Sequence, residues 1–329
     1  MNAREFGRRY AHLKRLIDRR LGAVVTSREP RDLAEACRYV LSAGGKRVRS
    51  VLVLLGCEAV GGDIRQAIDA GIAVELLHNF TLVHDDVMDN APSRRGRPTV
   101  HTKWNVNNAL LVGDVVVSLA YRSLLKTRTK DPRRICELFT NCFVDVCEGQ
   151  ALDLAFERKT HVSVSDYYRM IDKKTGRMIA TATELGARIG NGTDREAEAL
   201  RRFGRNLGRA FQLQDDLLDV VADEKEFGKT IGGDIVAGKK TFLLLKAIER
   251  ATGKDKRTLN SIIKTAGRPD RRTVEKVTAI YHKYGVIDEA RQQIRQTTAT
   301  SLAELAVLQQ NRGTRMLQWF SELLLRRVS

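Results

Sequence analysis

The sequence predicts an all-α protein, a single-domain helical bundle spanning residues 1–329, and three observations support this prediction. Long segments carry apolar residues at intervals of three and four, which is the spacing of one helical face. The alternation of apolar and polar residues that is typical of strands is scarce. Only five prolines occur, and no long flexible linker divides the chain.

The helical periodicity begins at the N-terminus and continues almost to the last residue. Phe6, Tyr10, Leu13 and Ile17 share one face of the first segment, which contains Glu5 and lacks the apolar core of a targeting peptide. We therefore expect a structural helix there. Glycine-rich stop signals separate the later segments, and the last helical segment can break near Gly313. Helices are expected over residues 3–22, 31–42, 47–60, 64–89, 105–127, 132–157, 165–188, 194–222, 234–251, 257–266, 271–284 and 285–327.

The chain is strongly basic, with 57 Lys+Arg against 40 Asp+Glu and a net charge of +17. No run of like charge, aromatic–basic interleaving or zinc-ligand spacing indicates a nucleic-acid partner, so most cations are expected on solvated helix faces. Five cysteines without a CxxC pair favour a reducing compartment, and we expect a cytoplasmic protein. No apolar stretch approaches the roughly 18 residues of a membrane span, and no stable membrane anchor is expected.

One short motif, DDxxD, occurs twice among apolar residues. Residues at positions i and i+4 of a helix share a face, so the first and last aspartate of each copy repel each other. Unpaired carboxylates among Leu, Val and Phe are costly, and a cation must offset them. Carboxylate oxygens without His or Cys partners suit Mg²⁺, which completes its coordination with water and phosphate. An acidic solvated turn is a reasonable explanation of one copy but not of two. The aspartates are Asp85, Asp86 and Asp89 in "HDDVMD", and Asp215, Asp216 and Asp219 in "LQDDLLD".

Basic residues stand in loops and at helix ends around the two motifs. The glycines of "GGKRVRS" let an anion approach the backbone beside a helix N-terminus, and the guanidinium forks of "SRRGRP" suit diphosphate oxygens. Each cation taken singly is more often a surface charge. Together with two carboxylate clusters, the set indicates two phosphorylated substrates. The candidates are Lys46, Arg47, Arg49, Arg94, Arg95, Lys174, Lys229 and Lys239, with His78 and Thr175 as additional donors.

In their order and spacing these motifs resemble the trans-isoprenyl diphosphate synthase (polyprenyl synthetase) family over about residues 40–245. The matching stretches are "GGKRVR", "HNFTLVHDDVMDNAPSRRGRPTVH", "KKTG", "FQLQDD" and "GKTIGGDIVAGKKT". The resemblance implies the isoprenoid synthase fold, a helical bundle around a deep central cavity with the aspartate motifs facing each other, and a homodimer. Ser50 stands where the family usually has proline, which puts the start of the following helix in question.

The resemblance also implies a role for each motif residue. Three Mg²⁺ ions are expected per substrate-bound active site, with Mn²⁺ as a substitute. Their ligands would be Asp85, Asp86, Asp89 and Asp215, with Asp216 and Asp219 contributing partly through water. The allylic diphosphate would bind Arg94, Lys174, Thr175, Gln212, Lys229 and Lys239. Isopentenyl diphosphate would bind Lys46, Arg49, His78 and Arg95, with Arg47 close by. Direct catalytic roles fall to Asp85, Asp86, Asp89, Arg94, Lys174, Asp215 and Lys229.

The implied reaction is head-to-tail prenyl transfer from dimethylallyl, geranyl or farnesyl diphosphate to isopentenyl diphosphate. Metal ions and cations stabilise the departing diphosphate, so that the allylic C–O bond ionises. The double bond of isopentenyl diphosphate then attacks the carbocation, and a proton is lost. An apolar cavity keeps water from quenching the cation.

The residues just before the first aspartate motif determine product length in this family. Phe80, five residues before Asp85, is bulky as in short-chain synthases that stop at C15 or C20, and Thr81 and Leu77 lie beside it. The first motif lacks the two-residue insertion common in bacterial farnesyl diphosphate synthases, which favours geranylgeranyl diphosphate. Helix geometry alone does not single out Phe80, because five residues turn about 140°. Simple core packing is the alternative.

Four other functions compete with this interpretation. A longer-chain polyprenyl diphosphate synthase keeps the same chemistry. A class I terpene cyclase normally has a second metal motif of Asn, Ser/Thr and Glu, and a non-catalytic synthase subunit typically lacks one aspartate motif. A basic nucleic-acid binder would leave the six aspartates unexplained and would be revealed by salt-sensitive binding.

Overall fold

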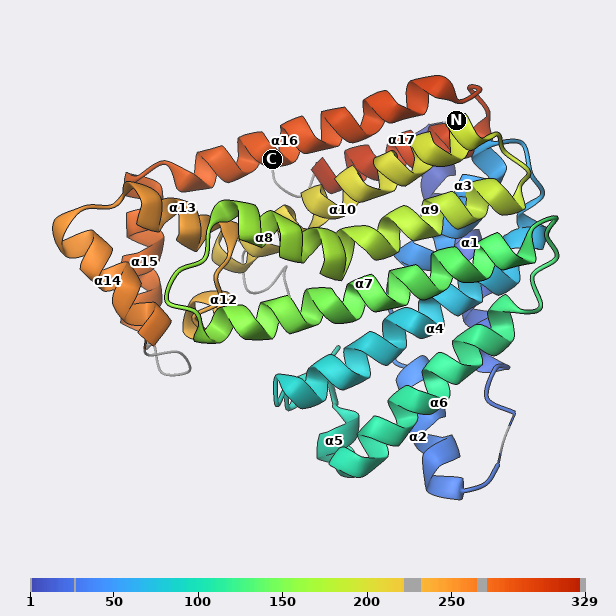
Figure 1. Cartoon of the computed structure of the whole chain (residues 1–329), viewed down its shortest axis with the longest axis horizontal. Helices are drawn as coiled ribbons and strands as arrows, with labels where there is room; N and C mark the ends of the chain where they lie inside the picture. The colour runs from blue at the N-terminus through green and yellow to red at the C-terminus, as the bar shows by residue number, and fades with distance from the viewer. Residues whose placement is uncertain (1, 27, 222–231, 265–270, 326–329) are drawn as a thin grey trace. The chain divides into compact units, whose positions relative to one another are not determined.

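The computed structural model describes residues 2–26, 28–221, 232–264 and 271–325. These residues are helical apart from loops and one two-stranded hairpin (Figure 1). The all-α prediction is therefore confirmed. Lys229, predicted to bind diphosphate, lies outside the described residues. The chain divides into two compact units, and the single domain over residues 1–329 stays a prediction. Unit 1 comprises Met1–Phe143, Met178–Gly204 and Glu304–Trp319, and unit 2 comprises Val144–Arg177, Arg205–Ala303 and Phe320–Ser329.

The helices follow the predicted segments closely over the first half of the chain. The first seven are α1 (Ala3–Gly22), α2 (Arg31–Leu41), α3 (Val48–Ala59), α4 (Ile64–Met88), α5 (Val100–Lys103), α6 (Val106–Leu124) and α7 (Pro132–Arg158). The hairpin strands are β1 (Ser93–Arg94) and β2 (Arg97–Pro98). The sequence analysis did not predict the hairpin or the short helix α5. Ser50 lies in the first turn of α3, where amide groups lack helical partners, so the missing proline does not prevent the helix.

Three predicted helices of the second half are divided. The segment over 165–188 covers nearly all of α8 (Val164–Ile171), the π-helix η1 (Asp172–Gly176) and α9 (Arg177–Ile189). The segment over 234–251 contains α12 (Gly233–Val236) and α13 (Phe242–Arg250). The last segment breaks at η2 (Leu305–Val307), before Gly313, between α16 (Val286–Glu304) and α17 (Arg312–Leu325). The remaining helices are α10 (Asp194–Val221), α14 (Gly253–Lys264) and α15 (Arg271–Lys283).

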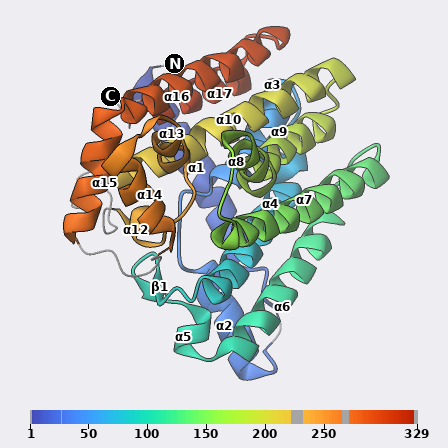
Figure 2. The ribbon, with the colours of Figure 1, turned by 60° about the vertical axis from the view of Figure 1, so that its left-hand side comes forward.

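Unit 1 is built around α3, which is buried from Ser50 to Ala59. A helix that is apolar on all sides must be surrounded by others, and α4 packs beside both α3 and α6 (Figures 1 and 2). Glycines bring α3 against α9. A Cβ on Gly186 would lie 2.1 Å from the Val53 carbonyl oxygen, and one on Gly56 would lie 2.5 Å from that of Thr183. The backbones of α3 and α9 are therefore in direct contact.

Unit 2 has its own apolar core, in which α8, α10 and the helices from α12 to α16 take part. Its largest fully buried rings belong to Tyr167, Phe242 and Tyr281. Figure 2 shows α12, α14 and α15, drawn in orange, grouped together, and α13 packs against α8, α14 and α15. Among the residues with a described position, no helix has both the length and the apolar character required to cross a membrane.

Candidate diphosphate-binding sites

The first aspartate motif lies at the C-terminal end of α4. Asp85 and Asp86 occupy the last turn, and Asp89 caps the helix with its backbone N–H bonded to the Asp85 carbonyl. The helix dipole disfavours negative charge at this end. Asp86 is only 5% exposed, whereas Asp89 is exposed. The motif thus places one carboxylate in the protein and one in solvent, both in a position that favours a nearby cation.

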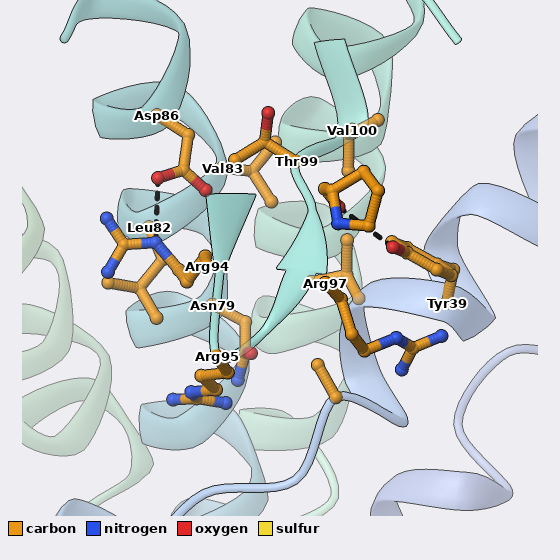
Figure 3. A pocket seen from close by; sticks show the side chains of 13 residues that line it. Tyr39, Asn79, Leu82, Val83, Asp86, Arg94, Arg95, Arg97, Thr99 and Val100 are labelled. Carbon is orange, nitrogen blue, oxygen red and sulfur yellow. Dashed lines mark hydrogen bonds and ion pairs between the residues drawn. The ribbon is translucent and has the colours of Figure 1, made fainter. Parts of the chain in front are cut away.

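The hairpin after α4 supplies that cation. Its turn residues Arg95 and Gly96 have φ of 54° and 72°, the left-handed conformation that a tight two-residue turn requires. Tyr39 of α2 holds the hairpin, because its hydroxyl donates to the Pro98 carbonyl at 2.8 Å and its ring lies 3.9 Å below the Arg97 guanidinium. Figure 3 shows Arg94 reaching toward Asp86, while Arg97 turns toward Tyr39.

Arg94 and Asp86 form an ion pair on the wall of an open pocket of about 400 Å³. Arg94 Nε donates to Asp86 Oδ1 at 2.7 Å. Burial raises the pKa of Asp86, and Arg94 opposes that rise only in part. Both residues were predicted to handle the same allylic diphosphate and its metal ions, and the structure brings them together. The remaining wall is largely apolar and includes Leu82, Val83 and Val100 (Figure 3).

A second group of predicted residues lies beside the "GGKR" loop. Arg49 Nη1 lies 3.3 Å from His78 Nε2. Arg95 donates to the Gly44 carbonyl, and Gly45 has a φ of 123°, which residues with a side chain rarely adopt, so the loop needs glycine there. Burial lowers the pKa of His78 well below its usual value, with Arg49 and Arg95 adding to the effect. The result is a neutral imidazole among guanidinium groups, which is a suitable place for an anion.

Arg47 belongs to the framework of this loop. It is 4% exposed, and its guanidinium already has three protein partners: Asp18 at 2.9 Å, Glu75 at 3.1 Å and the Leu41 carbonyl at 3.0 Å. It was predicted to lie close to isopentenyl diphosphate. The structure places it in the right loop but directs its donors into the protein.

The second aspartate motif lies on α10, in unit 2, beside the π-helix η1. A chain of hydrogen bonds links them: Thr175 Oγ1 donates to Gln212 Oε1 at 2.9 Å, and Gln212 Nε2 donates to Asp216 Oδ1 at 3.0 Å. Tyr167 donates to the other Asp216 oxygen at 2.7 Å. Three residues predicted from two separate motifs are therefore one connected group, oriented by a tyrosine that the sequence analysis did not identify.

Close backbone packing explains the position of η1. A Cβ on Gly149 of α7 would lie 2.4 Å from the Lys174 amide nitrogen, and one on Gly208 of α10 would lie 2.6 Å from the Gly176 Cα. The "KKTG" turn is thus pressed between two helices at glycines. The extra residue in a π-turn is frequent at functional sites, and here Lys174 lines a pocket while Thr175 donates to Gln212, which lines the same pocket.

That pocket has an open volume of about 460 Å³ and combines carboxylates with cations. Lys174 Nζ pairs with Asp153 Oδ2 at 2.6 Å, and Lys239 Nζ lies 3.6 Å from Asp234 Oδ1. Among the lining residues, the sequence analysis missed Asp153, Tyr167, Asp234 and Lys240. Asp234 stands within the quoted "IGGD" stretch and could have been found there, whereas no local pattern marks Tyr167.

The pKa of one carboxyl group in this pocket, that of Asp216, is strongly raised. Burial, with the nearby Asp234 carboxylate adding to it, raises the pKa of Asp216 to about 7. Asp219 accepts from the Asp234 backbone N–H at 2.9 Å and is 9% exposed, whereas Asp215 is exposed. A buried carboxylate with a raised pKa gains from an adjacent cation. The donor chemistry therefore fits Mg²⁺.

Neither motif forms a ready-made metal cage. In the described part of the chain, no three His, Cys, Asp or Glu side chains are grouped to hold an ion. Magnesium is commonly held by one or two carboxylates, with water and substrate phosphate completing its shell. Oxygen donors arranged this way fit metal binding that depends on a diphosphate.

The predicted chain-length residues lie one to two turns before the first motif. Phe80 is 8% exposed, and its ring stands edge-on to Phe143 at 5.1 Å between centroids. Leu77 is fully buried, and the Thr81 hydroxyl donates to the His78 carbonyl at 2.9 Å. Their role in product length stays a prediction.

An all-α fold with two DDxxD motifs, each beside basic side chains, defines a class of diphosphate-binding helical proteins. Residues 30–282 match the polyprenyl synthetase family, and the chain belongs to it. A short chain isoprenyl diphosphate synthase of Methanothermobacter thermautotrophicus is 37% identical over 328 residues, which cover 99% of each chain. A geranylgeranyl diphosphate synthase of Methanosarcina mazei is 40% identical over 253 residues, 76% of this chain and 77% of that one.

Solved structures agree with this family membership. The crystal structure of a geranylgeranyl pyrophosphate synthetase from Pyrococcus horikoshii matches with a TM-score of 0.93 at 37% identity, covering 98% of this chain and 99% of the other. The predicted family, the isoprenoid synthase fold and the prenyltransferase class are thereby confirmed.

Proposed function

We propose that this protein is a geranylgeranyl diphosphate synthase that adds isopentenyl diphosphate to allylic diphosphates and stops at C20. Short-chain prenyl transfer is confirmed by its relatives, which include short-chain isoprenyl and geranylgeranyl diphosphate synthases. The observation that carries the proposal lies in unit 1. An aspartate–arginine pair lies at the end of α4, and a cluster of anion-binding donors (the anion pocket: Arg49, His78 and Arg95) lies around His78 of the same helix, and two substrates with two diphosphates require two such groups.

The anion pocket is assigned to isopentenyl diphosphate. Arg49, His78 and Arg95 make it up, with Lys46 in the adjoining loop, and Arg95 also lines the pocket of Asp86 and Arg94. The imidazole is neutral at neutral pH, since burial and the nearby guanidinium groups lower its pKa. Its Nε2 accepts from Arg49, because a guanidinium group can only donate, so Nδ1–H is the donor left for the diphosphate, while the arginines supply the charge.

The aspartate motifs are assigned to the allylic diphosphate. By family analogy, the donors and charge for its oxygens would come from Arg94 beside Asp86 in unit 1 and from Lys174, Thr175, Gln212 and Lys239 near Asp216 in unit 2. Bound Mg²⁺ would stabilise the charge that develops on the leaving diphosphate. The six motif aspartates are its proposed ligands, and three ions per active site, with Mn²⁺ as a substitute, are proposed by family analogy. The side chains hold the diphosphate in place while the allylic C–O bond ionises.

The remaining expectations of the family are also proposals for this chain. We propose a homodimer that works in the cytoplasm on isopentenyl diphosphate with dimethylallyl, geranyl or farnesyl diphosphate. No nucleic-acid partner is proposed.

Adjacent arginines on the hairpin provide a matched test of these assignments. Arg94→Gln should lower kcat and raise KM for farnesyl diphosphate, because it removes a donor to the allylic diphosphate. Arg95→Gln should raise KM for isopentenyl diphosphate and leave that for farnesyl diphosphate nearly unchanged. Both variants would be assayed by incorporation of labelled isopentenyl diphosphate with Mg²⁺ and with a chelator. Equal effects on both KM values would contradict the assignment, and no incorporation by folded wild-type protein would refute the function.

A further inference from the structure

A buried carboxylate lies behind the anion pocket and takes no part in the functions assigned above. Glu75 of α4 is 1% exposed and stands three residues before His78. Its Oε1 accepts from Arg47 Nη1 at 3.1 Å, and its Oε2 accepts from the Ser50 hydroxyl at 2.8 Å. A buried charge is tolerated only when it is paired and hydrogen-bonded. Glu75 is fully paired, and both of its partners belong to the "GGKRVRS" segment.

Arg47 has an unusual backbone conformation that needs such support. Its φ of 54° and ψ of 34° are left-handed, which disfavours residues other than glycine by about 1 kcal/mol or more. It is also the residue from which α3 starts, since the Val51 amide bonds to its carbonyl at 3.1 Å. Asp18 and Glu75 hold its guanidinium from two sides. The ion pairs thus fix a strained residue between Lys46 and Arg49.

Other contacts hold the same loop at its outer side. The Tyr10 hydroxyl donates to the Lys46 carbonyl, and Arg95 donates to the Gly44 carbonyl. These bonds secure the backbone up to the peptide bond before Arg47. The buried side-chain network of Glu75, Arg47 and Ser50 reaches Arg47 itself and the first turn of α3, where Arg49 faces His78.

We propose that Glu75 is a positioning residue for isopentenyl diphosphate. Through Arg47 and Ser50 it holds the left-handed turn that directs Lys46 and Arg49 to the anion pocket. The proposal rests on the assignment of that pocket to isopentenyl diphosphate. Glu75 itself does not touch the substrate.

If Glu75 acts only through its charge, neutralising it should tighten anion binding; if it acts by positioning the loop, neutralising it should weaken anion binding. The sign of the change in affinity therefore decides between the two roles. Glu75 lies close enough to influence Arg95, whose pKa it raises against the lowering effect of burial and of Arg47. Removing this negative charge alone would make the pocket more positive and tighten anion binding. Loss of the turn would separate the donors and weaken binding. Glu75→Gln, which keeps the shape and removes the charge, distinguishes the two.

The experiment is calorimetric titration of the full chain with isopentenyl diphosphate in the absence of metal and allylic substrate. We expect Kd for Glu75→Gln to rise about tenfold, equivalent to about 1.4 kcal/mol. KM for isopentenyl diphosphate should rise in parallel, with little change in KM for farnesyl diphosphate. The matched control is Glu58→Gln, which removes another buried, arginine-paired carboxylate of the same unit; the partners of Glu58 are Arg9 and Arg312. It should leave Kd unchanged.

A milder variant covers the case in which Glu75→Gln does not fold. Ser50→Ala removes one hydrogen bond to Glu75 and retains every charge, so it should fold and raise Kd by about threefold. An unchanged or lower Kd in either folded variant overturns the positioning role while leaving the synthase function intact. Wild-type protein that neither binds isopentenyl diphosphate nor incorporates it would overturn both.

Discussion

Replacing Phe80 tests whether an aromatic ring limits the length of the product. Phe80 is 8% exposed and stands edge-on to Phe143 at 5.1 Å and tilted against His84 at 4.6 Å, so its ring is packed on two sides. Phe80→Ala leaves a cavity that its neighbours refill only in part. We expect a loss of about 3–5 kcal/mol in the free energy of unfolding and a shift of the product distribution to chains longer than C20.

The control for this variant lies on α7. Phe139 is fully buried and stands edge-on to Tyr121 at 5.2 Å, so Phe139→Ala removes a ring of the same size from a similar pair. It should cost similar stability without changing the product. Phe80→Leu should be more stable than Phe80→Ala and lengthen the product less.

The assay is chromatographic sizing of the dephosphorylated products from farnesyl diphosphate and labelled isopentenyl diphosphate, with the folded state checked by circular dichroism. An active, folded Phe80→Ala variant with the wild-type product distribution would show that Phe80 is core packing only. A shift produced equally by Phe139→Ala would trace the effect to general loosening.

Two further predictions concern stability. Burial and Asp234 raise the pKa of Asp216 to about 7, so the unfolding free energy of the metal-free protein should fall as the pH rises from about 4 to 8. In chemical denaturation, Asp216→Asn should be more stable than wild type at pH 8 and equally stable at pH 4. Parallel pH profiles of the two proteins would contradict this. Gly186→Ala places a Cβ 2.1 Å from the Val53 carbonyl oxygen and should lower the free energy of unfolding by several kcal/mol, as in other overpacked cores. Gly7→Ala, in open space on α1, should raise it by up to about 1 kcal/mol. Equal thermal midpoints for the two variants would refute the backbone-contact argument.

The periodicity of apolar residues predicted the long helices well because burial on one face leaves a regular pattern. For α1 the predicted range 3–22 agrees with Ala3–Gly22, and α4 ends one residue before its predicted limit. The π-helix η1 left no such trace. It depends on close contact with Gly149 and Gly208, which lie far from it in the sequence. The hairpin at 93–98 was predicted only as a break, because two-residue strands are too short to show alternation.

The candidate sites likewise contain residues that could be predicted from the sequence and residues that could not. Aspartates and cations could be selected by residue type and spacing, because metal and phosphate chemistry needs those groups. Their partners could not. Arg47 was grouped with the substrate ligands because its carboxylate partners Asp18 and Glu75 are 29 and 28 residues away in sequence. Tyr167 orients Asp216 from 49 residues away, and only the tertiary fold reveals that bond.

The most direct test of the account is the length of the product made by the purified wild-type protein. Labelled isopentenyl diphosphate would be incubated with Mg²⁺ and, separately, with the C5, C10 and C15 allylic diphosphates, and the dephosphorylated products would be sized. The account predicts a C20 product that disappears when a chelator removes the metal. Chains longer than C20 would contradict the proposed product, and the absence of incorporation from every primer by folded protein would contradict prenyl transfer itself.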